Sequence, residues 1–138
     1  MTPACGARRR LPGAGLSIAA GEWGTPGVPP ALLLHSLAAH GHWWDWTAPL
    51  LAERVHVVAL DFRGHGESQW AEPPAYRFDD HVADVVAAMD ALGWEAPLVV
   101  GHSMGGYVAA YLAALHARRV WRLVVADVLT GWTADVQA

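Results

Sequence analysis

The sequence predicts an α/β fold, with a mostly parallel β-sheet flanked by helices. Short apolar runs of strand length alternate with longer segments that have helical spacing. Strands that alternate with helices imply parallel pairing through right-handed crossovers. The chain has 138 residues, of which 54% are hydrophobic and 16% charged, so it is long and apolar enough to form one domain with a core.

The N-terminal region is expected to be the least ordered part of the chain. Residues 1–15 are interpreted as a flexible tail, and residues 16–138 as one partial domain. Within that domain, residues 16–20 and 22–24 predict a short hairpin that turns at Gly21. A Pro- and Gly-rich turn then leads to the first buried strand.

Further apolar runs predict the remaining strands and helices. The expected buried strands are residues 31–34, 55–60, 98–100 and 123–126. The expected helices are residues 46–53, 78–92 and 104–116. The second helix is the clearest. Its apolar residues, including Phe78, recur on one face, Asp79 and Asp80 lie in its first turn, and Gly93 closes it.

Charge and cysteine content restrict the class of partner and the compartment. The formal net charge of −4 argues against a nucleic-acid partner, and no apolar run reaches membrane-spanning length. The single cysteine, Cys5, cannot form an internal disulfide. Residues 8–20 resemble a secretion signal, but Pro12 and Gly13 interrupt their apolar part. We therefore expect a cytoplasmic protein that binds neither membranes nor nucleic acids.

The motif Gly101-His102-Ser103-Met104-Gly105 lies between an expected strand and an expected helix. This G-x-S-x-G arrangement is typical of a nucleophile elbow, in which a sharp turn exposes a serine hydroxyl at the edge of a sheet. A side chain two residues before or after the serine would collide with the backbone, which explains Gly101 and Gly105. The alternative interpretation is a glycine-rich turn in which Ser103 serves only as a helix N-cap.

Two further motifs precede this one at consistent distances. An apolar run leads into His35-Ser36, and the next strand leads into the D-x-R-G-x-G-x-S sequence of residues 61–68. Together with residues 101–106, these motifs resemble the N-terminal half of an α/β-hydrolase of the serine-nucleophile, esterase- and lipase-like branch. The resemblance covers about residues 16–130. It implies an α/β-hydrolase core truncated after about the sixth of the family's eight strands.

The resemblance also implies roles for individual residues. Ser103 would be the catalytic nucleophile, and the backbone N–H groups of Met104 and Leu37 would form the oxyanion hole. Loss of one such donor typically costs ~3–4 kcal/mol of transition-state stabilisation. The sequence departs from the family at Ser36, where the pattern has glycine. That side chain is expected to tilt the Leu37 amide or narrow the oxyanion hole.

The implied reaction is acyl transfer through a covalent acyl-enzyme. Serine at the elbow excludes the aspartate-based chemistry of the haloalkane dehalogenases and epoxide hydrolases of this fold. The expected substrate is a small apolar ester or related carbonyl compound, with no cofactor. Hydrolysis of a carbon–carbon bond and peracid formation by the same fold remain alternatives. Substrate identity and oligomeric state are beyond what the sequence specifies.

The family's triad acid and histidine would follow its seventh and eighth strands, and neither strand is recognisable after Ser103. Asp127 ends the sixth expected strand, where a few subfamilies place the acid, although a structural role is the plainer interpretation. The chain is therefore expected to be a fragment with little activity of its own. The alternatives are a non-catalytic binding protein on the same scaffold and a small protein that completes its sheet by dimerising.

The remaining histidines and tryptophans have structural and functional interpretations side by side. None of the eight histidines has the position that a general base needs. His40 and His42 have no third ligand at a suitable spacing, so no metal site is expected. Trp43 and Trp44 are candidates for the wall of an apolar substrate pocket, with packing as the alternative. Trp46 is expected to pack between a helix and the sheet.

Overall fold

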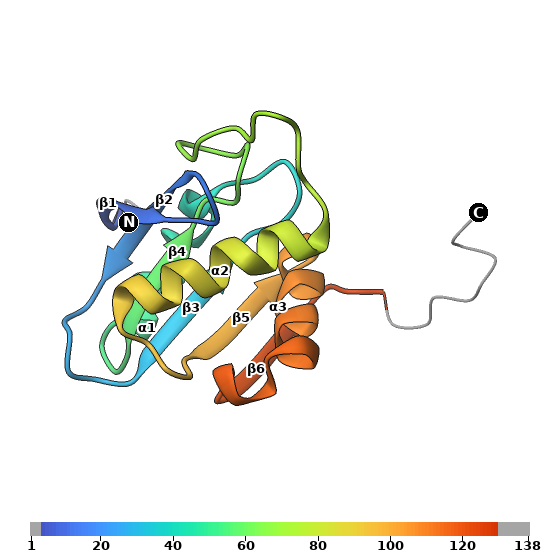
Figure 1. Cartoon of the computed structure of the whole chain (residues 1–138). Helices are drawn as coiled ribbons and strands as arrows, with labels where there is room; N and C mark the ends of the chain where they lie inside the picture. The colour runs from blue at the N-terminus through green and yellow to red at the C-terminus, as the bar shows by residue number, and fades with distance from the viewer. Residues whose placement is uncertain (1–3, 130–138) are drawn as a thin grey trace.

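The computed structural model describes residues 4–129, which form one six-stranded sheet covered by helices on both faces (Figure 1). The strand order is β1-β2-β4-β3-β5-β6. The strands are β1 (Ala7–Pro12), β2 (Ser17–Trp23), β3 (Pro30–Leu34), β4 (His56–Leu60), β5 (Leu98–His102) and β6 (Arg122–Ala126). The helices are η1 (Gly41–Trp44), α1 (Ala48–Leu51), α2 (Phe78–Leu92), α3 (Met104–Leu115) and η2 (Ala117–Arg119).

The predicted fold class is confirmed. β1 and β2 pair antiparallel, β2 joins β4 antiparallel, and β4, β3, β5 and β6 run parallel to one another. One core cluster joins α2 and α3 to the sheet through residues such as Leu32, Val85 and Leu112. A second cluster on the opposite face joins α1 and η1 to the sheet through Leu33 and Trp44. Alternate residues of the apolar strands therefore serve two separate core layers.

The N-terminal tail is a point where the sequence interpretation was wrong. Residues 7–12 form β1 rather than a flexible segment, although residues 1–3 lie outside the described residues. Leu11 is buried, and Arg8 Nη2 lies 2.7 Å from Asp61 Oδ2. Arg10 Nη1 donates to the carbonyl oxygen of Glu67 at 2.6 Å. Arg8 and Arg10 of β1 are thus paired with residues more than fifty positions away. The local sequence pattern therefore did not predict this strand.

The expected hairpin at Gly21 is also replaced by a different arrangement. Residues 17–23 form one continuous strand, in which Gly21 pairs with Arg8 on one side and Ala59 on the other. The chain turns earlier, where the N–H of Gly13 donates to the carbonyl oxygen of Leu16 at 2.8 Å. Residues 8–20, which resemble a secretion signal, thus lie within β1, this turn and β2 of the sheet.

The helices follow the prediction with one exception. α2 has the expected bounds and ends at Gly93, whose φ of 69° suits glycine, and α3 is one residue shorter than expected. The first expected helix is reduced to α1, because residues 41–47 form η1 and turns. Trp46 lies before α1 and is 55% exposed, so its predicted packing role is wrong. Among the described helices, none is long and apolar enough to cross a membrane.

The central strands of the sheet and its edge strand β6 differ in burial. β4 is buried along its whole length, and β3 nearly so. β6 forms the outer edge of the described sheet, and its apolar residues Leu123, Val124 and Val125 are 39–47% exposed. Within residues 4–129, β6 is therefore an edge strand with an exposed apolar surface.

Candidate active site

The turn between β5 and α3 places Ser103 at the edge of the sheet where the parallel strands have their carboxyl ends. Ser103 has φ 51° and ψ −115°, a backbone conformation that non-glycine residues rarely adopt. Its N–H donates to the carbonyl oxygen of Ala126 at 2.9 Å, and its own carbonyl oxygen accepts from Gly106 and Tyr107. The backbone is therefore held on both sides, while the hydroxyl has no hydrogen-bond partner among residues 4–129.

Steric contacts explain why glycines flank this serine. A Cβ added at Gly101 would lie 2.2 Å from the carbonyl oxygen of Gly105. A Cβ added at Gly105 would lie 2.3 Å from the carbonyl oxygen of Leu34 at the end of β3. Both distances are far below a van der Waals contact, and in each case the obstacle is backbone. The tight turn thus depends on the absence of these two side chains.

The two backbone amides named as oxyanion donors are free. Met104 is the first residue of α3, and Leu37 lies in the loop that follows β3. Neither N–H donates a hydrogen bond to any group within the described chain. The close approach of Gly105 to the carbonyl oxygens of Leu34 and His35 puts the start of α3 against the start of that loop. The positive end of the α3 dipole faces the same region, which suits a developing negative charge.

His35 connects the loop after β3 to the turn after β4. Its side chain is fully buried, its Nδ1 lies 2.7 Å from the carbonyl oxygen of Ser36, and its Nε2 accepts the N–H of Phe62 at 2.9 Å. The first contact requires a proton on Nδ1 and the second a lone pair on Nε2, so the ring is neutral. Burial lowers the pKa of His35 to about 4, which keeps it neutral in mildly acidic conditions. His35 therefore has a structural role.

Asp61 holds the turn after β4 in the same way. Its carboxylate accepts the N–H of Gly41 at 2.6 Å and that of Glu67 at 2.9 Å, in addition to the Arg8 guanidinium. Burial by itself would raise the pKa of Asp61, but the Glu67 and Gly41 hydrogen bonds and the charge of Arg8 together lower it. Ser68 completes the turn, because its hydroxyl donates to the Asp61 carbonyl oxygen at 2.6 Å.

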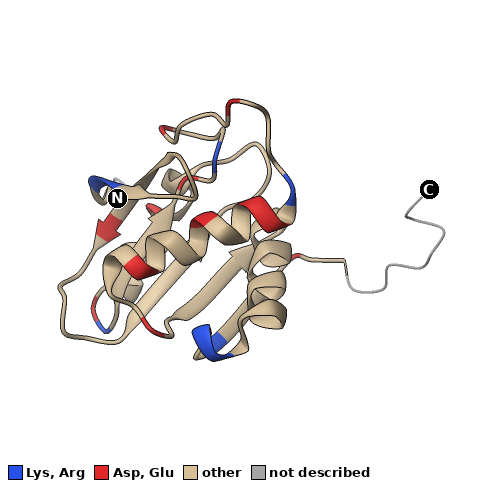
Figure 2. Cartoon of the chain, in the orientation of Figure 1, with Lys and Arg blue, Asp and Glu red and all other residues tan. Residues whose placement is uncertain are grey.

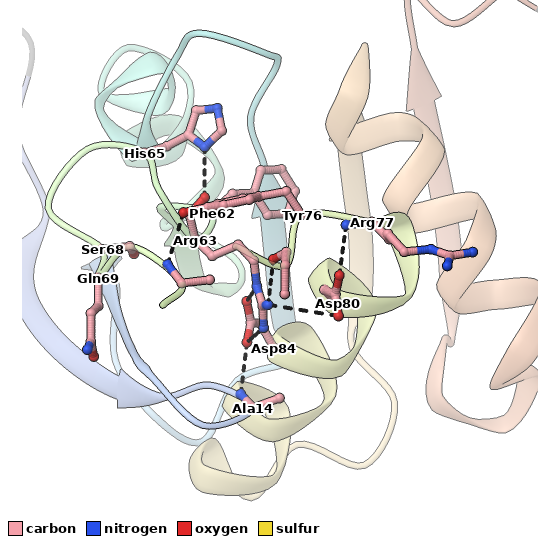
Figure 3. A network of polar contacts seen from close by, with 12 residues as sticks. Ala14, Phe62, Arg63, His65, Ser68, Gln69, Tyr76, Arg77, Asp80 and Asp84 are labelled. Carbon is pink, nitrogen blue, oxygen red and sulfur yellow. Dashed lines mark hydrogen bonds and ion pairs between the residues drawn. The ribbon is translucent and has the colours of Figure 1, made fainter. Parts of the chain in front are cut away.

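Arg63 forms a buried network beneath this turn (Figure 3). Its guanidinium donates from Nε and Nη2 to the two carboxylate oxygens of Asp84 in α2, at 2.6 and 2.7 Å. Nη1 donates to the Ala75 carbonyl oxygen, and Asp84 also accepts the N–H of Ala14. The Asp84 carboxylate raises the pKa of Arg63. The motif of residues 61–68 thus holds loops together.

The predicted aromatic pocket is formed by only one of its two tryptophans. Trp43 is 53% exposed, stacks on the His102 ring with 5.2 Å between centroids, and lines a cavity of about 330 Å³ with Ala38 and His40. Trp44 is 8% exposed and packs in the core on the α1 face. Of its two interpretations, packing therefore holds for Trp44, because successive residues of a 3₁₀-helix point about 120° apart and do not share one face.

A second cavity, of about 360 Å³, lies where the N-terminal ends of α2 and α3 meet, and sequence reasoning did not find it. Its lining includes Phe78, Met104 and Tyr111. Phe78 was expected on the buried face of its helix but is 44% exposed, because it stands in the first turn beyond the edge of the sheet. The sequence signal for this cavity was an apolar residue, Phe78, at the first position of α2. Its proximity to Met104 is visible only in the structure.

Charge is distributed away from the candidate nucleophile. β3, β5 and α3 carry no charged residue along their length, as Figure 2 shows. Asp127 follows β6, and its Oδ2 lies 3.5 Å from His102 Nε2, but its side chain is 85% exposed. Within the described chain, no histidine is hydrogen-bonded to Ser103. The described residues therefore place the Ser103 hydroxyl at the start of α3 near free amides, with no histidine hydrogen-bonded to it.

Comparisons with known proteins agree with this geometry. A family model described as "alpha/beta hydrolase fold" matches residues 29–136. A serine hydrolase-like protein of Danio rerio is 38% identical over 106 residues, which are 76% of this chain and 32% of that protein. Lipase LipV of Mycobacterium tuberculosis is 38% identical over 106 residues, which are 77% of this chain and 40% of that protein.

A solved structure described as a membrane phospholipase A, a bacterial virulence factor, is similar with a TM-score of 0.87 and 33% sequence identity. The match covers 93% of this chain and 41% of that one. The chain therefore spans between about a third and two fifths of the length of these three proteins. The matches extend across most of this chain, including the strands and loops that build the candidate site.

Proposed function

The chain belongs to the alpha/beta hydrolase fold family, and on that premise we propose that it carries the nucleophile and the oxyanion hole of a serine hydrolase. Ser103 would attack a carbonyl carbon and form an acyl-enzyme. The backbone N–H groups of Met104 and Leu37 would stabilise the oxyanion of the tetrahedral intermediate. The substrate would be a small apolar carboxylic ester or a related carbonyl compound.

The conformation of Ser103 is the observation that supports this proposal best. A positive φ at a non-glycine residue is costly, by about 1–3 kcal/mol, and persists only where the surroundings impose it. Here the surroundings impose it through two glycines packed against backbone. A serine that merely capped a helix would accept a hydrogen bond from the first turn of α3, whereas the Ser103 side chain makes no such bond.

The proposed preference for apolar acyl substrates rests on the side chains that line two cavities near Ser103. Trp43 lines the cavity on the His102 side, and Phe78, Met104 and Tyr111 line the cavity between α2 and α3. Polar side chains also line both cavities, Arg77 and Asp79 among them, so the apolar part of a substrate would lie against the aromatic residues and Met104. The names of the two matched relatives, a serine hydrolase-like protein and a lipase, fit the same class of reaction.

The general base is the part that the described residues do not supply. We propose that the histidine and the acid of the triad lie outside residues 4–129, in the region that corresponds to the remainder of the longer relatives. By itself the chain is then a slow nucleophile, because a positioned base typically contributes 10²–10⁴-fold to such a step. A cytoplasmic location and a small-molecule substrate without a cofactor belong to the same proposal.

Imidazole rescue tests this assignment directly. The 138-residue chain is incubated with a fluorophosphonate probe, with and without imidazole, and the labelled peptide is identified by mass spectrometry. We expect slow phosphonylation of Ser103, accelerated about tenfold or more by imidazole acting as a diffusible base. The Ser103→Ala variant is expected to yield no labelled peptide, whereas Ser17→Ala, which alters a serine of β2, should label like the parent chain.

Three other outcomes would revise the proposal in different ways. Labelling at a serine other than Ser103 would contradict the nucleophile assignment. Rapid labelling of Ser103 without imidazole would support the nucleophile but contradict the location of the base. No labelling under either condition would favour the second candidate function, a non-catalytic binding protein on this scaffold. The serine at position 36, where the family's pattern has glycine, is the observation that favours that alternative.

A further inference from the structure

Three side chains of metal-binding type meet on the face of the molecule where η1 contacts the segment before β1. Cys5, His42 and Asp45 each offer one ligand atom, and these atoms all lie within 4.8 Å of one another. Cys5 Sγ donates to Asp45 Oδ2 at 3.1 Å, and His42 Nδ1 lies 2.8 Å from the same oxygen. These residues have no part in the proposed hydrolase chemistry, so the cluster needs an explanation of its own.

We propose that Cys5, His42 and Asp45 form a binding site for a divalent metal ion of the zinc type. A thiolate, an imidazole and a carboxylate are the three ligand types that Zn²⁺ uses in proteins. Magnesium and calcium are disfavoured because they select oxygen ligands. With three protein ligands, the fourth tetrahedral position would be taken by water, which the exposure of Cys5 allows.

The spacing of the ligand atoms suits such an ion. Bonds of about 2.0–2.3 Å at tetrahedral angles separate neighbouring ligand atoms by about 3.3–3.8 Å. The two hydrogen-bonded pairs are slightly shorter than this, at 2.8 and 3.1 Å, and the cluster as a whole is no wider than 4.8 Å. Insertion of an ion therefore requires ligand shifts of less than about 1 Å, most of which rotation of an exposed Cys5 side chain can supply.

Asp45 supplies an independent reason to expect a cation. Its side chain is 8% exposed, and its second oxygen, Oδ1, is buried with no hydrogen-bond partner among the described residues. A buried carboxylate that is not fully paired is unfavourable, because it has lost the hydration of its charge. A divalent ion bound to this carboxylate and to the Cys5 thiolate would bring the net charge of the cluster to zero.

The ion would also reinforce the wall of the candidate active site. The segment that carries Cys5 is held to the sheet by the Trp23 indole, which donates to the Ala4 carbonyl oxygen at 2.8 Å. His42 lies in η1 beside Trp43, which stacks on His102, the residue before Ser103. A metal bridge from Cys5 to His42 and Asp45 would therefore anchor η1 in addition to that stacking contact.

The ligand set is dispersed in the sequence, which is why spacing failed to reveal it. His42 and Asp45 are separated by three positions, a common ligand spacing on a helical turn, but Cys5 is brought to them only by the placement of the N-terminal segment beside η1. His40, which the sequence had suggested as the partner of His42, is not a member of the cluster.

Cobalt substitution tests the proposal with a signal specific to Cys5. The 138-residue chain is titrated with Co²⁺, and then with Zn²⁺ as a competitor, while the absorption spectrum is recorded. Because Cys5 is the single cysteine, a sulfur-to-cobalt charge-transfer band reports ligation by this residue alone. We expect the band to appear at one equivalent, to vanish on addition of Zn²⁺, and to be absent in Cys5→Ser.

Matched variants separate this site from weaker surface binding. Asp45→Asn and His42→Ala are expected to weaken Co²⁺ binding by more than about 100-fold, the upper range for loss of a second-shell contact. His40→Ala removes a neighbouring histidine outside the cluster and is expected to leave the affinity within about threefold. Circular dichroism of each variant without metal establishes that the fold is retained.

Three results would overturn the proposal. A chain that binds Co²⁺ without the charge-transfer band does not use Cys5, and equal losses in His40→Ala and His42→Ala would indicate a surface pair of histidines. Absence of any binding at millimolar Co²⁺, with the circular dichroism spectrum of a folded chain, would likewise exclude the site. None of these results depends on the hydrolase assignment, because the readout does not involve Ser103.

Discussion

Two turns at the same edge of the sheet are stabilised in opposite ways. In the turn after β4, residues 61–68, the polar side chains of Asp61, Arg63 and Ser68 are all consumed by hydrogen bonds and ion pairs. In the turn after β5, residues 101–106, backbone packing of glycines holds the chain, and the Ser103 hydroxyl is left without a partner in the described residues.

The contrast teaches that residue type alone does not indicate function at such an edge. The turn after β4 has more charged and polar residues than the turn after β5, yet its Asp61, Arg63 and Ser68 side chains are already paired within the protein. The turn after β5 has a partly exposed serine whose hydroxyl has no partner among the described residues, unpaired amides nearby and a strained backbone, which are the properties of a reactive site. Three substitutions examine this difference, from the largest expected effect to the smallest.

Gly105→Ala tests whether close backbone packing stabilises the turn after β5. The new Cβ would lie 2.3 Å from the Leu34 carbonyl oxygen, and the obstacle is backbone rather than a flexible side chain. We expect the free energy of unfolding to fall by about 5 kcal/mol or more, an exceptional value for one methyl group. Urea denaturation followed by circular dichroism measures the change.

Gly93→Ala is the matched control for this substitution. Gly93 has φ 69°, but its added Cβ would meet nothing within 4 Å, so we expect a loss of only about 1 kcal/mol from backbone strain. Because Gly105 does not have a positive φ, equal losses in the two variants would contradict the close-packing explanation for glycine at this position.

Asp84→Ala removes the carboxylate that pairs with Arg63 of the turn after β4. The substitution leaves the Arg63 guanidinium buried without its bidentate partner, with 4% of that side chain exposed. We expect a loss of about 3–5 kcal/mol in the free energy of unfolding. Asp90→Ala removes the partner of Arg119 in an exposed pair with a similar 2.6 Å separation, and should cost less than about 1 kcal/mol. A comparable loss in both variants would contradict the structural role assigned to Arg63.

Ser103→Gly probes the strain at the nucleophile itself. Glycine adopts φ 51° without steric cost, so we expect this variant to be more stable than the parent chain by about 1 kcal/mol, while losing fluorophosphonate labelling. Ser36→Gly provides a control in the neighbouring loop, where the serine does not have a positive φ, and should be destabilising by about 0.5–1 kcal/mol. A destabilised Ser103→Gly chain would show that the hydroxyl has a structural role instead.

Helices and strands that depend on interactions between neighbouring residues were predicted well. A strand that depends on contacts between residues remote in sequence was not. The strands β3, β4 and β5 and the helix α2 were predicted close to their observed bounds, because an apolar strand or an amphipathic helix is encoded within a few neighbouring residues. β1 was missed because its strand character depends on the partners Asp61 and Glu67 of its arginines, some fifty residues away.

The candidate site shows the same division. The spacing of Gly101, Ser103 and Gly105 predicted a tight turn, because a steric requirement of adjacent backbone leaves a local signature. The directions of Trp43 and Trp44 depended on how η1 lies against the sheet, and the exposure of Phe78 on where α2 begins relative to the sheet edge. Neither relation is present in the local pattern.

The sequence by itself therefore determined the fold class, the strand and helix that flank Ser103, and the glycines that the turn requires. Those features rest on periodicity and on sterics between residues close in the chain. Only the tertiary structure decided which polar groups are already paired, which aromatic residues face solvent, and that Cys5 meets His42 and Asp45. Such relations depend on the distance between segments remote in sequence, which packing of the whole domain sets.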